Sequence, residues 1–129
     1  MDHTAETTLR LRAPTFAGLV REATRGFLSL VPDASRGALL PGERTFEIDA
    51  GDRTAALVEW INEMVFRSEA EGWLPVEVSV QEHEGGHVEV RYRAQRLLEP
   101  FVLVKAATFH GADIRETADG LVVDLTLDI

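Results

Sequence analysis

The sequence contains no cysteine, few positively charged residues and no long apolar run. Without cysteine, neither a disulfide framework nor a thiolate metal site can form, so a metal ion would need oxygen or imidazole ligands. No stretch approaches the roughly 20 apolar residues of a membrane-spanning helix. The start of the chain, Met1 to Glu6, also lacks the basic and apolar segments of a secretion signal. We therefore expect a cytoplasmic protein.

Positive charge is scarce, because 13 lysines and arginines face 22 aspartates and glutamates, which gives a formal net charge of −9. Such a charge repels phosphate backbones, so we expect no direct binding to nucleic acid. A basic protein partner or bound cations would suit it, and the alternative that acidity serves only solubility stays open. The 129 residues, of which 45% are hydrophobic, are enough for one domain over 1–129 with its own core.

Familiar catalytic motifs are missing as well. The sequence has no phosphate-binding P-loop, no dinucleotide glycine motif, no nucleophile elbow and no helical pair of metal-binding histidines. An enzyme that works alone is therefore the less favoured interpretation.

Apolar periodicity predicts the secondary structure. In the first half, alternation at every second residue indicates strands and a helical repeat indicates helices, with Thr15 and either Asp52 or Thr54 as N-caps. These patterns predict a strand over 7–13, a helix from Thr15 to before Pro32, a short strand around 46–48 and a helix ending at Gly72.

The second half of the sequence is predicted to form strands. The patterns predict a β-hairpin of 76–80 with 88–92, a strand over 101–109 buried on both faces, and a closing hairpin of 112–117 with 121–128. We expect an α+β fold in which two helices cover one face of a largely antiparallel sheet of about six strands.

Candidate ligands lie near both ends of the chain. Alternation in the last strand places Asp128 on a polar, acidic face, where its carboxylate and the terminal Ile129 could bind one hard cation. His3 and Glu6 offer further ligands if the termini meet. A solvated, frayed terminus is the competing interpretation, and spacing alone favours it.

Lys105 interrupts the apolar run 101–109. Its ammonium must reach outward to solvent, pair with a carboxylate or serve a site. His83 and His87 flank a predicted turn, and we assign them no role because exposed turn histidines are mostly incidental.

Four segments together resemble the archease family. Residues 3–6 are similar to its His-Thr-Ala-Asp start, with Glu6 at the Asp position. Residues 55–64 resemble its segment around Trp-Leu-Asn-Glu, 104–110 resemble its Val-Lys-Ala-x-Thr-Tyr-His, and 127–129 match its final Leu-Asp-Ile. These segments occur in the family's order and are spread over nearly the whole chain, from residue 3 to residue 129.

The resemblance implies an archease-like fold and a cytoplasmic accessory protein, with no catalysis of its own. It implies a divalent cation, Ca²⁺, Mg²⁺ or Mn²⁺, bound by Glu6, Asp128 and Ile129, with Lys105 as a functional lysine beside them. It further implies that the protein promotes guanylylation and turnover of an RtcB-type RNA ligase in tRNA splicing or RNA repair. Archeases are also described as chaperone-like modulators.

The residues are also compatible with two other functions. One is a protein-binding module that keeps the fold without the metal. The other is a small metal-dependent phosphohydrolase using Glu6, Asp128 and Lys105, although so few carboxylates are a poor basis for two-metal chemistry.

Overall fold

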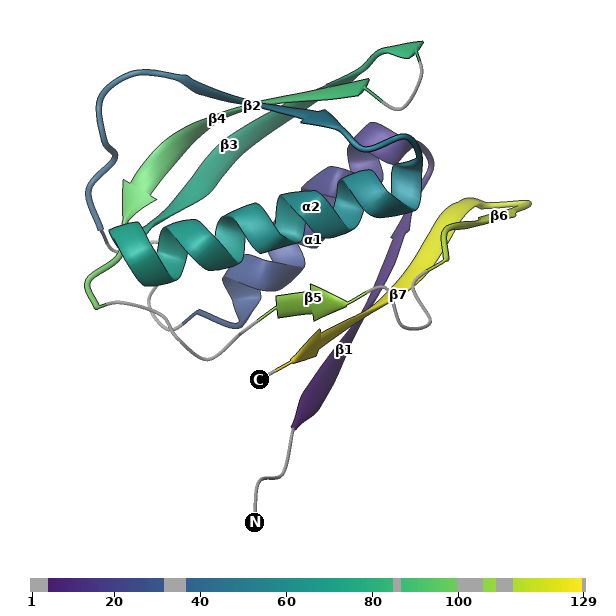
Figure 1. The fold of residues 1–129 in the computed structure, drawn as a ribbon, viewed down its shortest axis with the longest axis horizontal. Coiled ribbons are helices and arrows are strands. Elements are labelled where there is room, and N and C mark those ends of the chain that lie inside the picture. The colour runs from purple at the N-terminus through teal and green to yellow at the C-terminus, as the bar shows by residue number, and fades with distance from the viewer. Residues whose placement is uncertain (1–4, 32–36, 85–86, 100–105, 109–112, 129) are drawn as a thin grey trace.

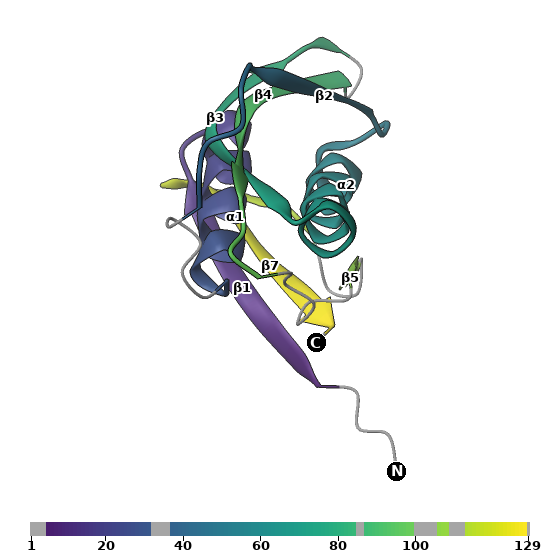
Figure 2. The same ribbon diagram turned by 90° about the vertical axis from the view of Figure 1, so that its left-hand side faces the viewer.

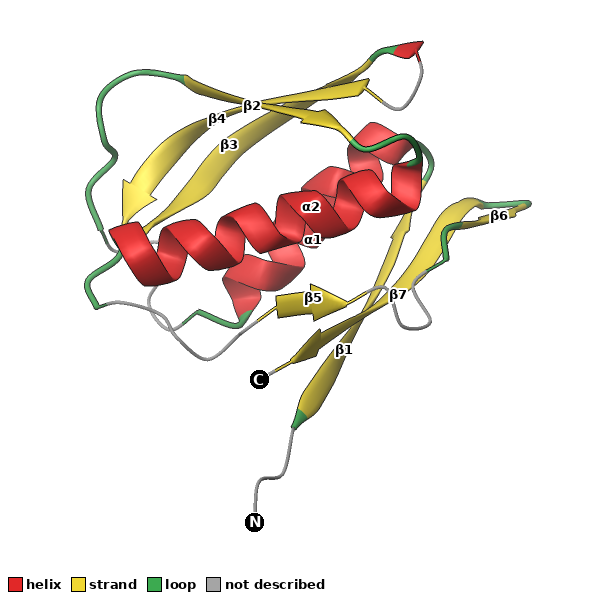
Figure 3. Ribbon diagram, in the orientation of Figure 1, coloured by secondary structure: helices red, strands yellow, loops and turns green. Residues whose placement is uncertain are grey.

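The computed structural model describes residues 5–31, 37–84, 87–99, 106–108 and 113–128 (Figure 1). Strands and helices alternate first, and five strands then follow (Figure 3). The elements are β1 (Glu6–Ala13), α1 (Phe16–Ser29), β2 (Arg44–Asp49), α2 (Arg53–Phe66), the π-helical turn η1 (Arg67–Glu71), β3 (Trp73–Glu82), β4 (His87–Arg96), β5 (Ala106–Thr108), β6 (Arg115–Thr117) and β7 (Gly120–Asp128).

The strands form two antiparallel sheets. We call the first the terminal sheet: it has the order β1-β7-β5, with β6 also paired to β7. The second, the hairpin sheet, has the order β2-β4-β3. The predicted α+β class, with two helices and antiparallel strands, is therefore confirmed, but the strands are divided between two sheets where the sequence predicted one.

Both helices lie between the two sheets (Figure 2). Helix α1 packs against β1 of the terminal sheet and β3 of the hairpin sheet, while α2 packs against β5 and β2. Two sheets can form because each helix has buried apolar side chains over a wide part of its surface. Each helix therefore contacts one sheet on either side. No helix in the described part of the chain is long and apolar enough to cross a membrane.

Side-chain caps begin both helices. The Thr15 hydroxyl accepts a hydrogen bond from the Gly18 amide at 3.1 Å, as the sequence predicted. Of the two candidates for α2, Asp52 is the cap, and its carboxylate accepts from the Ala55 amide at 2.8 Å. Gly72 follows η1 with a positive φ of 73°, which glycine adopts without strain.

Trp60 occupies the centre of the core and is fully buried. Its indole N–H donates to the Thr24 hydroxyl on α1 at 2.9 Å, so its one polar atom has a partner. Its ring lies 5.9 Å from that of Phe46 on β2 and 5.7 Å from that of Tyr92 on β4. One side chain of α2 thus joins α1 to the hairpin sheet.

The two predicted hairpins are confirmed. β3 and β4 pair over a longer stretch than expected, with an irregularity between Val76 and Ser79. β6 and β7 form the closing hairpin, although β6 is only Arg115–Thr117. Of the strand predicted over 101–109, only β5 falls within the described residues, and Ala107 in it is buried.

Candidate metal site at the paired chain ends

Pairing of β1 with β7 brings the two ends of the chain together. Glu6 lies directly opposite Asp128 in the register, and Figure 1 shows the start of β1 beside the end of β7. Residues directly opposite in an antiparallel pair point to the same face, with Cβ atoms about 5 Å apart. Two carboxylates predicted from separate parts of the sequence therefore meet, and we call them the carboxylate pair.

The carboxylate pair suits a hard cation. Glu6 is exposed and Asp128 is partly buried, and neither has a hydrogen-bond or ion-pair partner within the described residues. Carboxylate oxygens on neighbouring strands are the ligands that Ca²⁺, Mg²⁺ or Mn²⁺ prefers. The pair supplies only two side chains, because no three His, Asp or Glu residues in the described ranges gather closely enough to hold a metal.

The next carboxylate along this face of β7 is that of Asp124, and it already forms an ion pair. Arg10 donates to Asp124 through Nε at 2.9 Å and Nη2 at 3.2 Å, which forms a bidentate pair across β1 and β7. The hydrogen bond from Arg10 lowers the pKa of the Asp124 carboxyl. A cation at the carboxylate pair must therefore take its other ligands from the chain terminus, solvent or a partner.

Three of the predicted site residues, His3, Lys105 and Ile129, lie outside the described residues. Their neighbours in sequence are nevertheless informative. Ala106, which follows Lys105, pairs with Asp128 on the side of β7 opposite Glu6. Asp128 thus lies in the middle strand, between the strand that carries Glu6 and the strand that Lys105 immediately precedes.

Asn62 on α2 holds β5 in this arrangement. Its Oδ1 accepts a hydrogen bond from the Ala107 amide at 2.8 Å, and its Nδ2 lies 3.5 Å from the Ala107 carbonyl oxygen. The first contact is a good hydrogen bond and the second is at the limit of one. Sequence analysis assigned no role to Asn62, although a polar residue beside the apolar stripe of an amphipathic helix was a signal that something nearby needs its amide.

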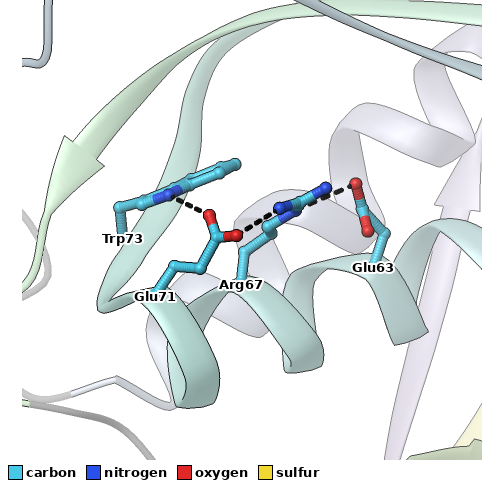
Figure 4. Close-up of polar contacts among 4 residues, drawn as sticks. All are labelled: Glu63, Arg67, Glu71 and Trp73. Carbon is cyan, nitrogen blue, oxygen red and sulfur yellow. Dashed lines mark hydrogen bonds and ion pairs between the residues drawn. The ribbon is translucent and has the colours of Figure 1, made fainter.

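A charged network follows Asn62 at the end of α2 (Figure 4). Arg67 pairs with Glu63 at 3.2 Å and with Glu71 at 2.6 Å, and the Trp73 indole N–H donates to the other Glu71 oxygen at 2.8 Å. These contacts tie the last turn of α2 and the π-helical turn η1 to the start of β3. The network therefore supports the helix that positions β5.

The fold places the chain in a class of small two-sheet α+β proteins, of which solved structures exist. An archease described as a possible chaperone, from Thermotoga maritima, superposes with a TM-score of 0.73 at 21% identity, covering 100% of this chain and 94% of that one. Protein 1598 of Methanobacterium thermoautotrophicum gives a TM-score of 0.68 at 22% identity, covering 100% and 96%. At these identities the likeness shows the fold.

The sequence comparisons show the family. The model of the Archease protein family matches residues 1–129, and the chain belongs to the archease family. The chain is 29% identical over 137 aligned positions to the protein archease of Methanopyrus kandleri, and 28% identical over 133 to that of Archaeoglobus fulgidus. Each alignment covers 100% of this chain and 96% of the relative.

Proposed function

We propose that this protein is a metal-dependent accessory factor that promotes guanylylation and repeated turnover of an RtcB-type RNA ligase in the cytoplasm. The observation that carries the proposal is the register of β1 and β7, which sets Glu6 directly opposite Asp128 in a chain that belongs to the archease family. The protein carries out no catalysis itself; the ligase supplies the nucleophile and the base.

The carboxylate pair would hold a divalent cation, with Ile129 as a further ligand. Once bound, such a cation neutralises charge on phosphate oxygens and orients them. Glu6 and Asp128 fit this task because each is accessible and neither is committed to an arginine within the described residues. Insertion of this end of the terminal sheet near the ligase active site would bring the cation to the nucleotide.

Lys105 would act beside the carboxylate pair, because it is the residue before Ala106, the register partner of Asp128. It is also the single lysine of the chain. Reductive methylation with ¹³C therefore labels one side chain besides the N-terminus, and its NMR signal should shift when Mg²⁺, Ca²⁺ or Mn²⁺ is added. A signal unaffected by every metal would separate Lys105 from the site.

Multiple-turnover RNA ligation by the cognate RtcB-type ligase, with GTP and a divalent metal, tests the function. The native protein should raise the number of turnovers, and Glu6→Gln or Asp128→Asn should remove most of that increase, because each removes one ligand charge at nearly unchanged size. Glu47→Gln is the matched control, since Glu47 is an exposed carboxylate of the hairpin sheet without a partner among the described residues.

Calorimetry tests metal binding independently of the ligase. Titration with Mg²⁺, Ca²⁺ and Mn²⁺ should show binding that Glu6→Gln and Asp128→Asn weaken and Glu47→Gln leaves intact. Absence of carboxylate-dependent binding would favour a protein-binding module of the archease fold, a role that the description of the Thermotoga maritima relative as a possible chaperone also suggests. Metal-dependent cleavage of simple phosphate esters would instead indicate a phosphohydrolase.

A further inference from the structure

A cluster of arginines occupies the other end of the outer face of the terminal sheet. Arg10 and Arg12 come from β1 and Arg115 from β6, and we call these three residues the arginine patch. In the register, Arg12 and Arg115 both pair with Val122 of β7, so one lies on either side of it. All three arginine side chains are exposed.

Val122 forms the floor of this patch. Alternation along β7 points Val123 into the core and Val122 to the outer face, yet Val122 is only 6% exposed. The arginines of the patch, with Glu116 and Thr117, surround it in a shallow depression of about 390 Å³. An apolar floor beneath the aliphatic stems of arginines holds those stems flat and presents their guanidinium groups at the rim.

The guanidinium groups of Arg12 and Arg115 remain available. Arg10 is committed to Asp124 through its bidentate pair. Within the described residues, no ion pair or hydrogen bond engages the side chain of Arg12 or Arg115. In a chain with 22 acidic and 13 basic residues, two neighbouring arginines that form no ion pair within the described residues are unexpected, even though the charge of Asp124 acts on Arg115.

We propose that Arg12 and Arg115 form a docking site for carboxylate side chains of an acidic segment in a protein partner. The planar fork of arginine binds carboxylates in a bidentate manner, and the Arg10–Asp124 pair shows this geometry on the same face. The depression gives room for an acidic side chain to lie over Val122 between the two guanidinium groups.

Protein carboxylates fit this surface better than a nucleic-acid backbone. A net charge of −9 repels every anion, but it repels a long polyanion more than a short acidic segment, and Glu116 and Asp124 interrupt the positive charge within the patch itself. Two free guanidinium groups neutralise one or two carboxylates, whereas backbone binding needs a continuous basic track. The surface therefore matches a few charges at fixed positions.

The docking site is separate from the carboxylate pair and does not depend on a metal or a ligase. Six positions of β1 separate Arg12 from Glu6, which is about 20 Å at the rise of a strand. A partner that meets both ends of this face would need a basic or metal-binding region for one and an acidic segment for the other. Such opposite charges would fix the direction in which it docks.

NMR titration of the ¹⁵N-labelled protein tests the docking site. Hexaglutamate at low ionic strength serves as the probe, with hexaglutamine and hexauridylate as comparisons. Hexaglutamate should shift the side-chain Nε–H signals of Arg12 and Arg115 and the amides around Val122, and hexaglutamine should not. The variant R12Q/R115Q should bind about tenfold more weakly. The control R21Q/R96Q, which removes two exposed arginines elsewhere, should keep the affinity.

Three outcomes would overturn the proposal: no shift at the patch, equal weakening in both double variants, or tighter binding of hexauridylate than of hexaglutamate at the same residues. The last would make the patch a nucleic-acid surface. If R12Q/R115Q does not fold, R12K/R115K replaces it, because lysine keeps the charge and the stem but loses the fork. That variant should also bind several-fold more weakly, and unchanged binding would contradict a bidentate site.

Discussion

The two sheets differ in how far apart their strands lie in the sequence. The hairpin sheet uses one stretch, residues 44–96, and one of its two pairings is the local hairpin of β3 and β4. The terminal sheet pairs β1 with β7, and the Arg10–Asp124 contact joins residues 114 positions apart. Closing so long a loop costs chain entropy that a hairpin does not, so the terminal sheet depends on the rest of the core.

This difference assigns the sheets different tasks. The hairpin sheet and the two helices make a frame in which β3 and β4 pair locally and buried rings join α2 to β2 and β4. The terminal sheet brings together Glu6, Asp128 and β5, which no local pattern could do. The carboxylate pair therefore exists only when the chain has folded as a whole.

The largest effect is expected from Trp60→Ala, which removes the side chain that joins α1 to the hairpin sheet. The lost burial and the resulting cavity should reduce the free energy of unfolding by about 3 to 5 kcal/mol. Denaturant unfolding measures the loss. Because the terminal sheet depends on this core, hydrogen exchange should accelerate in both sheets. Acceleration confined to β2, β3 and β4 would show that the terminal sheet folds by itself.

A smaller and local effect is expected from Asn62→Ala. The buried Ala107 amide would lose its partner, at a cost of about 1 to 2 kcal/mol. Exchange at Ala107 should accelerate while β3 and β4 stay protected. Under the proposed function, stimulation of the ligase should fall although Glu6 and Asp128 are intact.

Asn62→Asp is the matched control for that prediction. Its carboxylate still accepts from the Ala107 amide but cannot donate to the Ala107 carbonyl oxygen, which lies at 3.5 Å. Stability close to that of the native protein would show that the accepting contact is the important one. If Asn62→Ala leaves exchange at Ala107 unchanged, β5 does not depend on α2.

Local patterns predicted most elements of the fold. Thr15 as a cap and the β3–β4 hairpin follow from side chains within a few positions of each other, and both are confirmed. The division into two sheets was not predictable, because period-2 alternation shows that a strand has a buried face but not which helix covers it. The residues suggested a meeting of Glu6 with Asp128 only on the condition that the chain termini lie together, and only the family resemblance assigned both residues to one site.

There is also a physical reason why sequence analysis missed Asn62 and the arginine patch. Asn62 contacts backbone atoms 45 positions away, and the sequence contains no sign of that distance. The arginine patch was missed because Arg10 and Arg12 read as the solvated side of an alternating strand. Only the register with Val122 and Arg115 shows that they share a surface with a third cation.

The smallest effect is expected from Glu82→Gln, which tests the ion pair that links the start of α2 to the end of β3 in the frame. Arg53 donates to Glu82 through Nε at 2.7 Å and Nη2 at 2.8 Å, and this hydrogen bonding lowers the pKa of the Glu82 carboxyl. Since both side chains are partly exposed, the variant should lose only about 0.5 kcal/mol near pH 7.

The pH dependence identifies the source of that loss. The pKa of Glu82 is lower in the folded than in the unfolded protein, so its contribution is fully present above the ordinary carboxyl pKa and is lost as pH falls through the lowered value. Unfolding of the native protein and the variant should therefore differ at pH 7, and the difference should close in acid. A difference that persists below the folded pKa would mean that Glu82 stabilises the frame by packing and not by its charge.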